Sequence, residues 1–282
     1  MDVYTYDIQH IYKVISLHDS IGLLYKTYKR NSKYIFTKLY YSFCEYIYKK
    51  RERKIINEYS KCIFVSDKDK KFLMGNNKRN DSKIVVIPNG VNQCLLDKGD
   101  KFITDVNTIV FSGIMDYKPN IDAVVYFVNC VLPLILEANK NIIFYIVGKN
   151  PTAEVTQLKS DNVIVTGWVD DISEYVCKGS VYVSPLITGA GLKNKILEAM
   201  ALKRPIVASS ISVDGLNIKD GYHLYVADSR EVFADKVLNL LNSSDKRDFL
   251  VKNAYELVGE EYTWDVVLNR YRRYIFDIKA ES

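Results

Sequence analysis

The sequence has 282 residues, a length that suits one large domain or two modest ones and excludes a peptide or a bare repeat module. Hydrophobic residues make up 48% and charged residues 26%, with 13 Gly and 6 Pro, which excludes a disordered, fibrous or disulfide-dense chain. The net charge is +5, yet residues 26–54 alone hold ten basic and two acidic side chains. This basic segment suits contact with an anionic surface better than a nucleic-acid-coating role, although a solvated helix face has the same composition.

The apolar pattern in chain order predicts nine strands and six helices. The predicted strands are 12–17, 61–65, 84–87, 108–112, 142–147, 163–165, 181–183, 205–208 and 224–227. The predicted helices are 33–59, 121–137, 194–202, 231–241, 246–258 and 264–278. Continuous apolar runs such as Ile142–Val147 are typical of parallel strands that helices cover on both faces. The alternation therefore predicts a doubly wound α/β architecture.

A polar break near residues 95–107 divides the chain. Three strands and one long helix precede it, too few for a complete sheet, whereas about six strands follow it, enough for a complete Rossmann-like sheet. We therefore expect a partial N-terminal domain over residues 1–105 and a complete C-terminal domain over 106–262. Residues 263–282 form a last helix, and it either returns to the N-terminal part or packs inside its own domain.

The cysteines and apolar runs indicate the cellular compartment of the protein, and the histidines bear on metal binding. The five cysteines are scattered and never spaced C-x-x-C, which is typical of reduced thiols in a cytosolic protein. The three histidines never approach a metal-ligand spacing, so we expect no protein-bound metal. We find no apolar stretch of the roughly 18 residues that a membrane span needs, and residues 1–7 lack a signal-peptide layout. We expect a cytoplasmic protein that is free or peripheral on the inner face of the membrane.

The stretch 181–209 carries the clearest chemistry. A strand ends near Ser184, a loop with Gly189 and Gly191 follows, and a helix begins near Asn194. Glycines let backbone N–H groups approach a ligand, and the free donors of a helix start favour a phosphate. Lys193 and Lys195 add positive charge at the same end, where the helix dipole gains nothing from cations, so a bound anion explains them better.

Glu198 shares a helix face with Lys195, and its carboxylate can accept hydrogen bonds from two ribose hydroxyls. The alternative is an exposed Lys–Glu pair worth only about 0.3–0.5 kcal/mol. The loop also approaches the dinucleotide fingerprint, with Gly189 and Gly191 but Asn194 in place of the third glycine. A nicotinamide enzyme is therefore a remote alternative, because the motif also occurs late in the chain.

Several elements together resemble family 4 of the retaining glycosyltransferases over roughly residues 84–275. In order they are Phe111–Ala123, Val147–Gly148, Thr166–Asp171, Gly189–Ala201 and Val213–Leu216, preceded by Pro88–Val91 and Leu17–Ser20. The resemblance implies a GT-B fold, in which two Rossmann-like domains face a cleft and the C-terminal one holds a nucleotide-diphosphate sugar. The donor substrate would carry the activated sugar, so no separate cofactor is expected.

The resemblance also implies roles for individual residues. Glu198 would bind the donor ribose, and Gly113 would lie beside the donor. The diphosphate and sugar would lie against Gly189, Ala190, Gly191, Leu192, Lys193, Asn194 and Lys195. Lys118 would neutralise charge on the leaving group, and His18 would face the acceptor. Their alternatives are a solvated lysine beside Pro119 and a surface histidine at a strand end.

The sequence departs from the family pattern in three places. Ala190 stands where many members have a first glutamate, and Ile114 stands where many have arginine. Lys193 and Lys195 supply positive charge that compensates for the arginine. Nothing in residues 1–17 corresponds to the strands and glycine-rich loop that precede the His18 region in family members, so the chain resembles an N-terminally truncated member.

Eight aromatic residues alternate with lysines between Tyr28 and Tyr48. Such a segment suits an anionic membrane interface, where a lipid-linked acceptor would reside, although single-stranded nucleic acid and a buried helix face are alternatives. We expect a glycosyltransferase that moves a sugar to a lipid-linked or polysaccharide acceptor in surface-glycan assembly, without nucleic acid as partner. The alternative is a truncated, non-catalytic module that binds nucleotide sugars or docks a partner.

Overall fold

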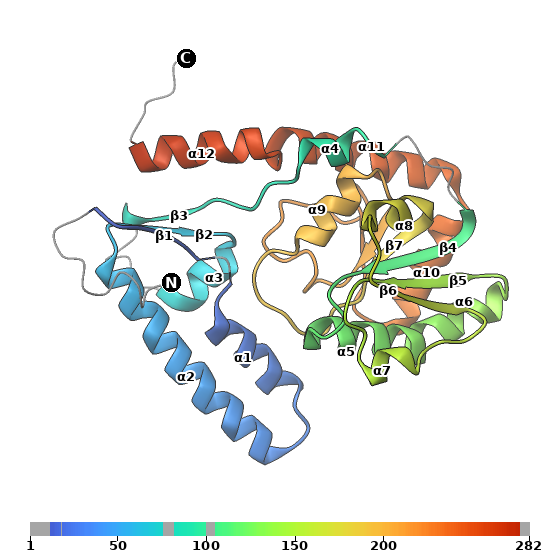
Figure 1. Cartoon of the computed structure of the whole chain (residues 1–282), viewed down its shortest axis with the longest axis horizontal. Helices are drawn as coiled ribbons and strands as arrows, with labels where there is room; N and C mark the ends of the chain where they lie inside the picture. Colours follow the sequence, from blue (N-terminus) through green and yellow to red (C-terminus); the bar gives the residue numbers. More distant parts are fainter. Residues whose placement is uncertain (1–11, 18, 76–81, 100–104, 277–282) are drawn as a thin grey trace.

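The computed structural model describes residues 12–17, 19–75, 82–99 and 105–276, and these form two parallel sheets with their helices (Figure 1). The smaller sheet has the order β1-β2-β3, with β1 (Val14–Leu17), β2 (Lys61–Phe64) and β3 (Ile84–Val86). The larger sheet has the order β6-β5-β4-β7-β8-β9. Its strands are β4 (Asp105–Ser112), β5 (Ile143–Val147), β6 (Val163–Gly167), β7 (Gly179–Ser184), β8 (Ile206–Ala208) and β9 (Tyr225–Val226). Each predicted strand overlaps one of these.

Helices cover both faces of the larger sheet, which explains the continuous apolar runs of its strands. Successive residues of β4 alternate between two buried clusters, with Ile109 and Phe111 in one and Val110 in the other. The first cluster includes side chains of α5 (Lys118–Tyr126), η3 (Phe127–Val131), α6 (Leu132–Ala138) and α10 (Arg230–Leu241). The second includes α8 (Ile172–Lys178), α9 (Asn194–Ala201) and α11 (Ser244–Glu261). The short helix α7 (Ala153–Thr156) follows β5.

One correction concerns the helix formed by α5, η3 and α6. By length and composition alone, Lys118–Ala138 is apolar enough to cross a membrane, contrary to our sequence expectation. In the fold, however, Phe127, Val131 and Ile135 of this segment are fully buried in the core of the larger sheet. A helix that covers a parallel sheet needs a wide apolar face, which accounts for its composition.

The smaller sheet is also covered on both faces. On one face, β2 packs against Ile55 and Ile56 of α2 (Ile35–Glu58) and Leu73 of α3 (Asp67–Met74). On the other face, Val267 of α12 (Trp264–Phe276) is buried with Ile63 and Ile87. The last helix thus lies against the N-terminal sheet, far along the chain from it (Figure 1).

A helical hairpin projects from the smaller sheet (Figure 1). Its first helix, α1 (Ile21–Asn31), was not predicted from the sequence. It forms because buried polar groups hold its start: the Ser20 hydroxyl donates to Glu52 at 2.8 Å, and the Ile21 N–H donates to the same carboxylate at 2.7 Å. Tyr25 of α1 stacks on Tyr48 of α2, with 5.4 Å between ring centroids.

The chain passes between its N-terminal and C-terminal halves twice, near Val91 and near Trp264, and these two crossing segments lie side by side. The Val91 N–H donates to the Tyr262 carbonyl at 2.7 Å, and the Trp264 N–H donates to the Val91 carbonyl at 3.3 Å. Helix α4 (Gln93–Leu96) follows the first crossing and packs near α9. Both crossings therefore form one two-stranded hinge.

Candidate functional site

The glycine loop between β7 and α9 forms the centre of the site. Gly191 has a φ of +66°, a conformation that favours glycine. Lys193 is the N-cap of α9 and makes no side-chain cap hydrogen bond, so it leaves the first N–H groups of the helix without a side-chain acceptor. Its ammonium group donates instead to the carbonyl of Ala190 at 2.6 Å and to that of Gly191. Both the N–H donors and the cation are placed to receive an anion.

Lys195 lies one residue into α9 and points at the end of β4. Its ammonium donates to the Asn120 side chain at 2.7 Å and stands 4.2 Å from the centroid of the Phe111 ring. Burial, with a smaller contribution from the nearby Lys193, lowers the pKa of Lys195 to about 7. A buried lysine whose charged form is disfavoured both by burial and by a second lysine is typical of a site that binds an anionic ligand.

Gly113 lies just after the end of β4, at a position that has no room for a side chain. A Cβ at this position would lie 2.7 Å from the Asn120 amide nitrogen and 2.9 Å from the Lys195 ammonium. Gly148, which ends β5, approaches even more closely, because its Cβ would lie 1.8 Å from the Gly113 carbonyl oxygen. Gly148 thus lets β5 end against the Gly113 backbone, and Gly113 leaves room for the Asn120 and Lys195 side chains.

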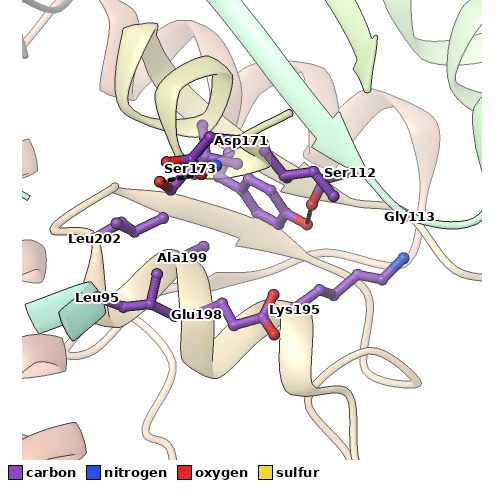
Figure 2. Close-up of a pocket in the computed structure, with 12 residues that line it drawn as sticks. Leu95, Ser112, Gly113, Asp171, Ser173, Lys195, Glu198, Ala199 and Leu202 are labelled. Atoms are coloured by element: carbon purple, nitrogen blue, oxygen red, sulfur yellow. Dashed lines mark hydrogen bonds between the residues drawn. The ribbon is translucent and has the colours of Figure 1, made fainter. Parts of the chain in front are cut away.

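Two cavities meet at these residues. The larger, of about 390 Å³, is lined by Gly189, Ala190 and residues 192–194 of the loop, by Tyr117 and Asn120, and by Asp19 of the N-terminal half. The smaller, of about 310 Å³, extends between α8 and α9 (Figure 2). Gly113, Lys195 and Glu198 line both cavities. An elongated ligand could therefore run from one cavity to the other across these three residues.

Glu198 lies on α9 between the cavities, and Figure 2 shows its carboxylate directed toward the cavity space. Desolvation by the surrounding protein raises the pKa of this carboxyl, and the nearby Lys195 opposes the rise. Behind it, the buried Tyr182 hydroxyl shares a hydrogen bond of 2.9 Å with the Ser112 hydroxyl.

Thr188 provides a further polar group in the loop. Thr188 is 3% exposed, and its hydroxyl has no hydrogen-bond partner among the described residues. Buried polar groups normally have partners, so this unpaired hydroxyl is an exception, although Thr188 lines neither cavity.

The N-terminal half closes the site through three contacts. Asp19 lines the larger cavity together with Lys193; burial lowers the pKa of that lysine, and the charge of Asp19 opposes the fall. The Asn31 side chain donates to the Ile187 carbonyl at 2.6 Å, and the Asn89 side chain donates to that of Asn194 at 3.0 Å. The cavity is thus built from both halves.

The structure brings together most of the residues that the sequence selected. Those that line a cavity are Gly113, Gly189, Ala190, Leu192, Lys193, Asn194, Lys195 and Glu198. Gly191 lies in the same loop. Lys118, the first residue of α5, lines neither cavity, and its ammonium pairs with Asp122. His18 lies outside the described residues.

Sequence reasoning missed the partners of these residues. Asn120 holds Lys195 in place, and Asp19 lines the larger cavity opposite the loop. Asp171 and Ser173 line the far end of the smaller cavity. Asn120 and Asp171 belong to conspicuous motifs, but nothing in those motifs indicates which distant side chain each one contacts. Among the described residues, no group of three or more His, Cys, Asp or Glu is placed to hold a metal ion.

Comparisons with known proteins identify the class of fold. Residues 106–243 match the family model described as glycosyl transferases group 1. A crystal structure of a Staphylococcus aureus TarM variant, in complex with fondaparinux, α-GlcNAc-glycerol and UDP, superposes with a TM-score of 0.73. The identity is 17%, over 96% of this chain and 52% of TarM. The chain thus has the α/β fold of the GT-B glycosyltransferases, and residues 106–243 are similar to the group 1 glycosyltransferase domain.

Two curated relatives extend the comparison. An uncharacterized 44.6 kDa protein in the cps region of Klebsiella pneumoniae is 24% identical over 261 residues, which cover 89% of this chain and 65% of that protein. The phosphatidyl-myo-inositol mannosyltransferase of Mycobacterium leprae is 29% identical over 214 residues, which cover 71% of this chain and 55% of the enzyme. The chain therefore spans between half and two thirds of the length of the relatives it matches.

Proposed function

We propose that this chain is a retaining glycosyltransferase of family 4 that transfers a sugar from a nucleotide-diphosphate sugar to a lipid-linked or polysaccharide acceptor in surface-glycan assembly. The observation that carries the proposal is the convergence of Lys195, Glu198 and Gly113 on two adjoining cavities. The mannosyltransferase and cps-region relatives and the TarM complex with UDP support the donor and the pathway class. The donor carries the activated sugar, so the proposal includes no separate cofactor.

In this proposal the donor lies across the two cavities. Glu198 accepts hydrogen bonds from the ribose, and the diphosphate lies at the start of α9 beside Lys195 and Lys193. The sugar occupies the larger cavity, between the glycine loop and Asp19. Two cations and the helix start then oppose the negative charge that develops on the departing diphosphate.

The transfer step follows from this placement. The bond between the anomeric carbon and the diphosphate oxygen breaks, and the acceptor oxygen forms its new bond on the same face. A donor phosphate oxygen takes the acceptor proton, so the nucleoside diphosphate leaves with it. Orientation of both substrates in the cleft supplies much of the rate. Lys118 contributes to charge neutralisation only when it leaves Asp122. The proposed role of His18, a hydrogen bond to the acceptor hydroxyl, concerns a residue outside the described part of the chain.

A direct experiment is to incubate the chain with UDP- and GDP-sugars and measure nucleotide release and binding. We expect wild-type binding by calorimetry that falls at least about tenfold in Glu198→Ala and in Lys195→Ala, since each loses a charge-assisted hydrogen bond. Glu256→Ala, an exposed glutamate on α11, is the matched control. Binding that is unchanged in both site variants would contradict the site, and an inverted anomeric configuration by NMR would contradict retention.

A non-catalytic module is the second candidate, because the two cavities account for binding of a nucleotide sugar without requiring its transfer. Such a module would bind the nucleotide sugar through the same residues without turnover. Calorimetric binding combined with no transfer or donor hydrolysis supports this candidate. Nucleotide release that disappears in Lys195→Ala supports the enzyme.

We also propose that the enzyme is a cytoplasmic protein held on the inner membrane face by α2. Every third or fourth residue of its first half is a large apolar side chain directed to solvent, and Phe36 and Phe43 are 82% and 63% exposed. The same face continues in Lys50 and Lys54. An aromatic stripe followed by basic residues suits the interface of an anionic membrane, where a lipid-linked acceptor resides.

Sedimentation with vesicles tests the membrane proposal separately from catalysis. We expect the chain to sediment with phosphatidylglycerol-containing vesicles and not with phosphatidylcholine alone. Phe36→Glu with Phe43→Glu should abolish the binding, while Phe249→Glu, a half-exposed position on α11, should leave it intact. Equal binding by both variants, or none by the wild type, would rule out α2 as the membrane surface.

A further inference from the structure

The larger cavity extends beyond the residues that it shares with the smaller one, and Asp19 lies on the wall that the N-terminal half contributes. With the ribose at Glu198 and the diphosphate at Lys195, as proposed above, this outer part is left for the transferred sugar. Among the described residues that line the larger cavity, Asp19 is the one carboxylate besides Glu198. An acid therefore lies where the sugar would bind.

The C-terminal half offers few side-chain acceptors to sugar hydroxyls in this part. Three of its lining residues in the loop have no polar side-chain atom, namely Gly189, Ala190 and Leu192. The Asn120 amide oxygen accepts from the Lys195 ammonium at 2.7 Å, and the Asn194 amide oxygen accepts from the Asn89 side chain at 3.0 Å. A carboxylate has about four acceptor positions and no donor. Among the described lining residues of this outer part, Asp19 is therefore the strongest acceptor for O–H groups.

The charge of Asp19 acts on both walls of this outer part. It adds to the rise that burial causes in the pKa of Tyr117, and it opposes the fall that burial causes in the pKa of Lys193. A carboxylate that acts on both residues lies close to the cavity that they line. Its negative charge repels a phosphate, whereas a neutral sugar carries hydroxyls that donate to it. The electrostatics thus favour the sugar at this wall over the diphosphate.

The backbone beside Asp19 is held by two buried carboxylates. The Ser20 N–H donates to Asp69 at 3.0 Å, and the Ser20 hydroxyl donates to Glu52 at 2.8 Å. Glu52 and Asp69 are 7% and 1% exposed, and burial of a carboxylate is costly unless hydrogen bonds compensate for its lost hydration. Both acids bind the residue that follows Asp19, so they fix the chain where Asp19 enters the cavity wall. A side chain that binds a ligand needs such a fixed backbone.

We propose that Asp19 binds hydroxyl groups of the transferred sugar and thereby aligns the sugar in the larger cavity. The sugar O–H groups donate to the carboxylate in charge-assisted hydrogen bonds, and its two oxygens can receive two adjacent hydroxyls. The N-terminal half then contributes directly to recognition of the donor, on the side opposite the glycine loop. This contribution belongs to the sugar and not to the nucleotide. The inference rests on the proposed nucleotide-sugar function.

Calorimetry on the full chain without acceptor tests this role, with UDP, GDP, UDP-glucose, UDP-galactose, UDP-N-acetylglucosamine and GDP-mannose as probes. We expect Asp19→Ala to weaken the nucleotide sugar that the wild type binds most tightly by about tenfold, the size of one charge-assisted hydrogen bond. The matching bare nucleotide should bind as tightly as before or more tightly, because the variant removes a negative charge from the cavity wall. Asp19→Asn should lose less than Asp19→Ala, because its amide oxygen still accepts from a hydroxyl. Asp245→Ala, which removes an exposed acid from the first turn of α11, is the control.

The outcomes separate this inference from the function on which it rests. If Asp19→Ala binds the nucleotide sugar as tightly as the wild type does, or loses the bare nucleotide to the same extent, the role of Asp19 is overturned while the nucleotide site stands. Binding of none of the six probes by the wild type overturns both. Thermal unfolding of Asp19→Ala and Asp19→Asn shows whether a loss is due to misfolding. A folded Asp19→Asn that loses more than Asp19→Ala also overturns the inference.

Discussion

At the residue scale, the ionisation of Lys195 controls how tightly the site binds an anion. Its pKa is lowered to about 7, so the ammonium form predominates below pH 7 and is lost above it. Because the diphosphate needs the cation, we expect the affinity for a nucleotide-diphosphate sugar to fall roughly tenfold between pH 6 and pH 8. Calorimetry across this range measures the change, and proton uptake on binding at pH 8 should accompany it.

Two variants identify the lysine responsible for this pH dependence. Lys195→Met should bind weakly at every pH, with a flat profile. Lys118→Met should keep the wild-type profile, because pairing with Asp122 raises the pKa of Lys118 and leaves it charged throughout. A wild-type affinity that does not change between pH 6 and pH 8 would contradict the lowered pKa of Lys195.

Gly113 makes a second residue-scale prediction. In Gly113→Ala the new methyl group would lie within 3 Å of both the Asn120 amide and the Lys195 ammonium, so the pair must separate. We expect nucleotide-sugar affinity to fall at least about tenfold, with the larger sheet still folded, because the neighbours are side chains that can move. Calorimetry together with circular dichroism measures the two effects. Unchanged affinity in a folded variant would show that the Lys195–Asn120 pair does not serve the donor.

The motifs indicate which residues gather at the site, and the tertiary structure decides what each one contacts. Lys195 was predicted because a glycine loop before a helix with cations at its start favours an anion, Glu198 because it shares the helix face of Lys195, and Gly113 through the family resemblance. Neither Asn120 as the partner of Lys195 nor Lys98 as the partner of Asp171 was predictable, because each pair joins segments more than 70 positions apart. Nothing in a local pattern encodes such pairs.

At the element scale, the strands and the long helix α2 were predictable, and the first helix of the N-terminal hairpin, α1, was not. Each strand of the larger sheet is apolar on both faces, a pattern that few other elements share. Helix α1 alternates tyrosines and lysines, and it depends on buried Glu52 at its start and on Tyr25–Tyr48 stacking along its side. Those stabilising contacts come from α2, so the local sequence of α1 gives a weak signal.

Helix α11 offers a prediction about local stability. Gly259 lies within this helix, is exposed, and has no atom within 4 Å of where a Cβ would stand. Gly259→Ala removes backbone freedom from the unfolded chain without a clash, so we expect it to raise the free energy of unfolding by about 0.5 kcal/mol. Urea unfolding followed by circular dichroism measures the gain. A loss of stability would mean that the last turn of α11 is not helical in solution.

At the scale of the whole molecule, the return of α12 makes the two ends of the chain interdependent. The sequence stripe from Trp264 to Ile275 showed that this helix packs on something, but periodicity carries no information about the partner. In the structure Val267 is fully buried against Ile63 and Ile87 of the small sheet. The N-terminal half is therefore stabilised by packing of α12, and the backbone hydrogen bond between Val91 and Trp264 joins the two crossings.

Gly90 tests that hinge. A Cβ at this position would lie 2.8 Å from the Trp264 ring and 3.0 Å from its backbone nitrogen and Cα, and backbone atoms cannot yield as a flexible side chain does. We expect Gly90→Ala to push the two crossings apart and to lower the free energy of unfolding by about 1–3 kcal/mol. Because the crossings couple the halves, unfolding should separate into two transitions.

Fluorescence reports this change directly. The chain has two tryptophans, so Trp168→Phe leaves Trp264 as the sole probe at the hinge. In that background Gly90→Ala should shift the Trp264 emission and move its urea transition away from the transition seen by circular dichroism, whereas Gly259→Ala should leave the two coincident. Coincident transitions with an unchanged midpoint in Gly90→Ala would show that the crossings tolerate separation. The two halves would then be coupled instead through the cleft contacts of Asn31 and Asn89.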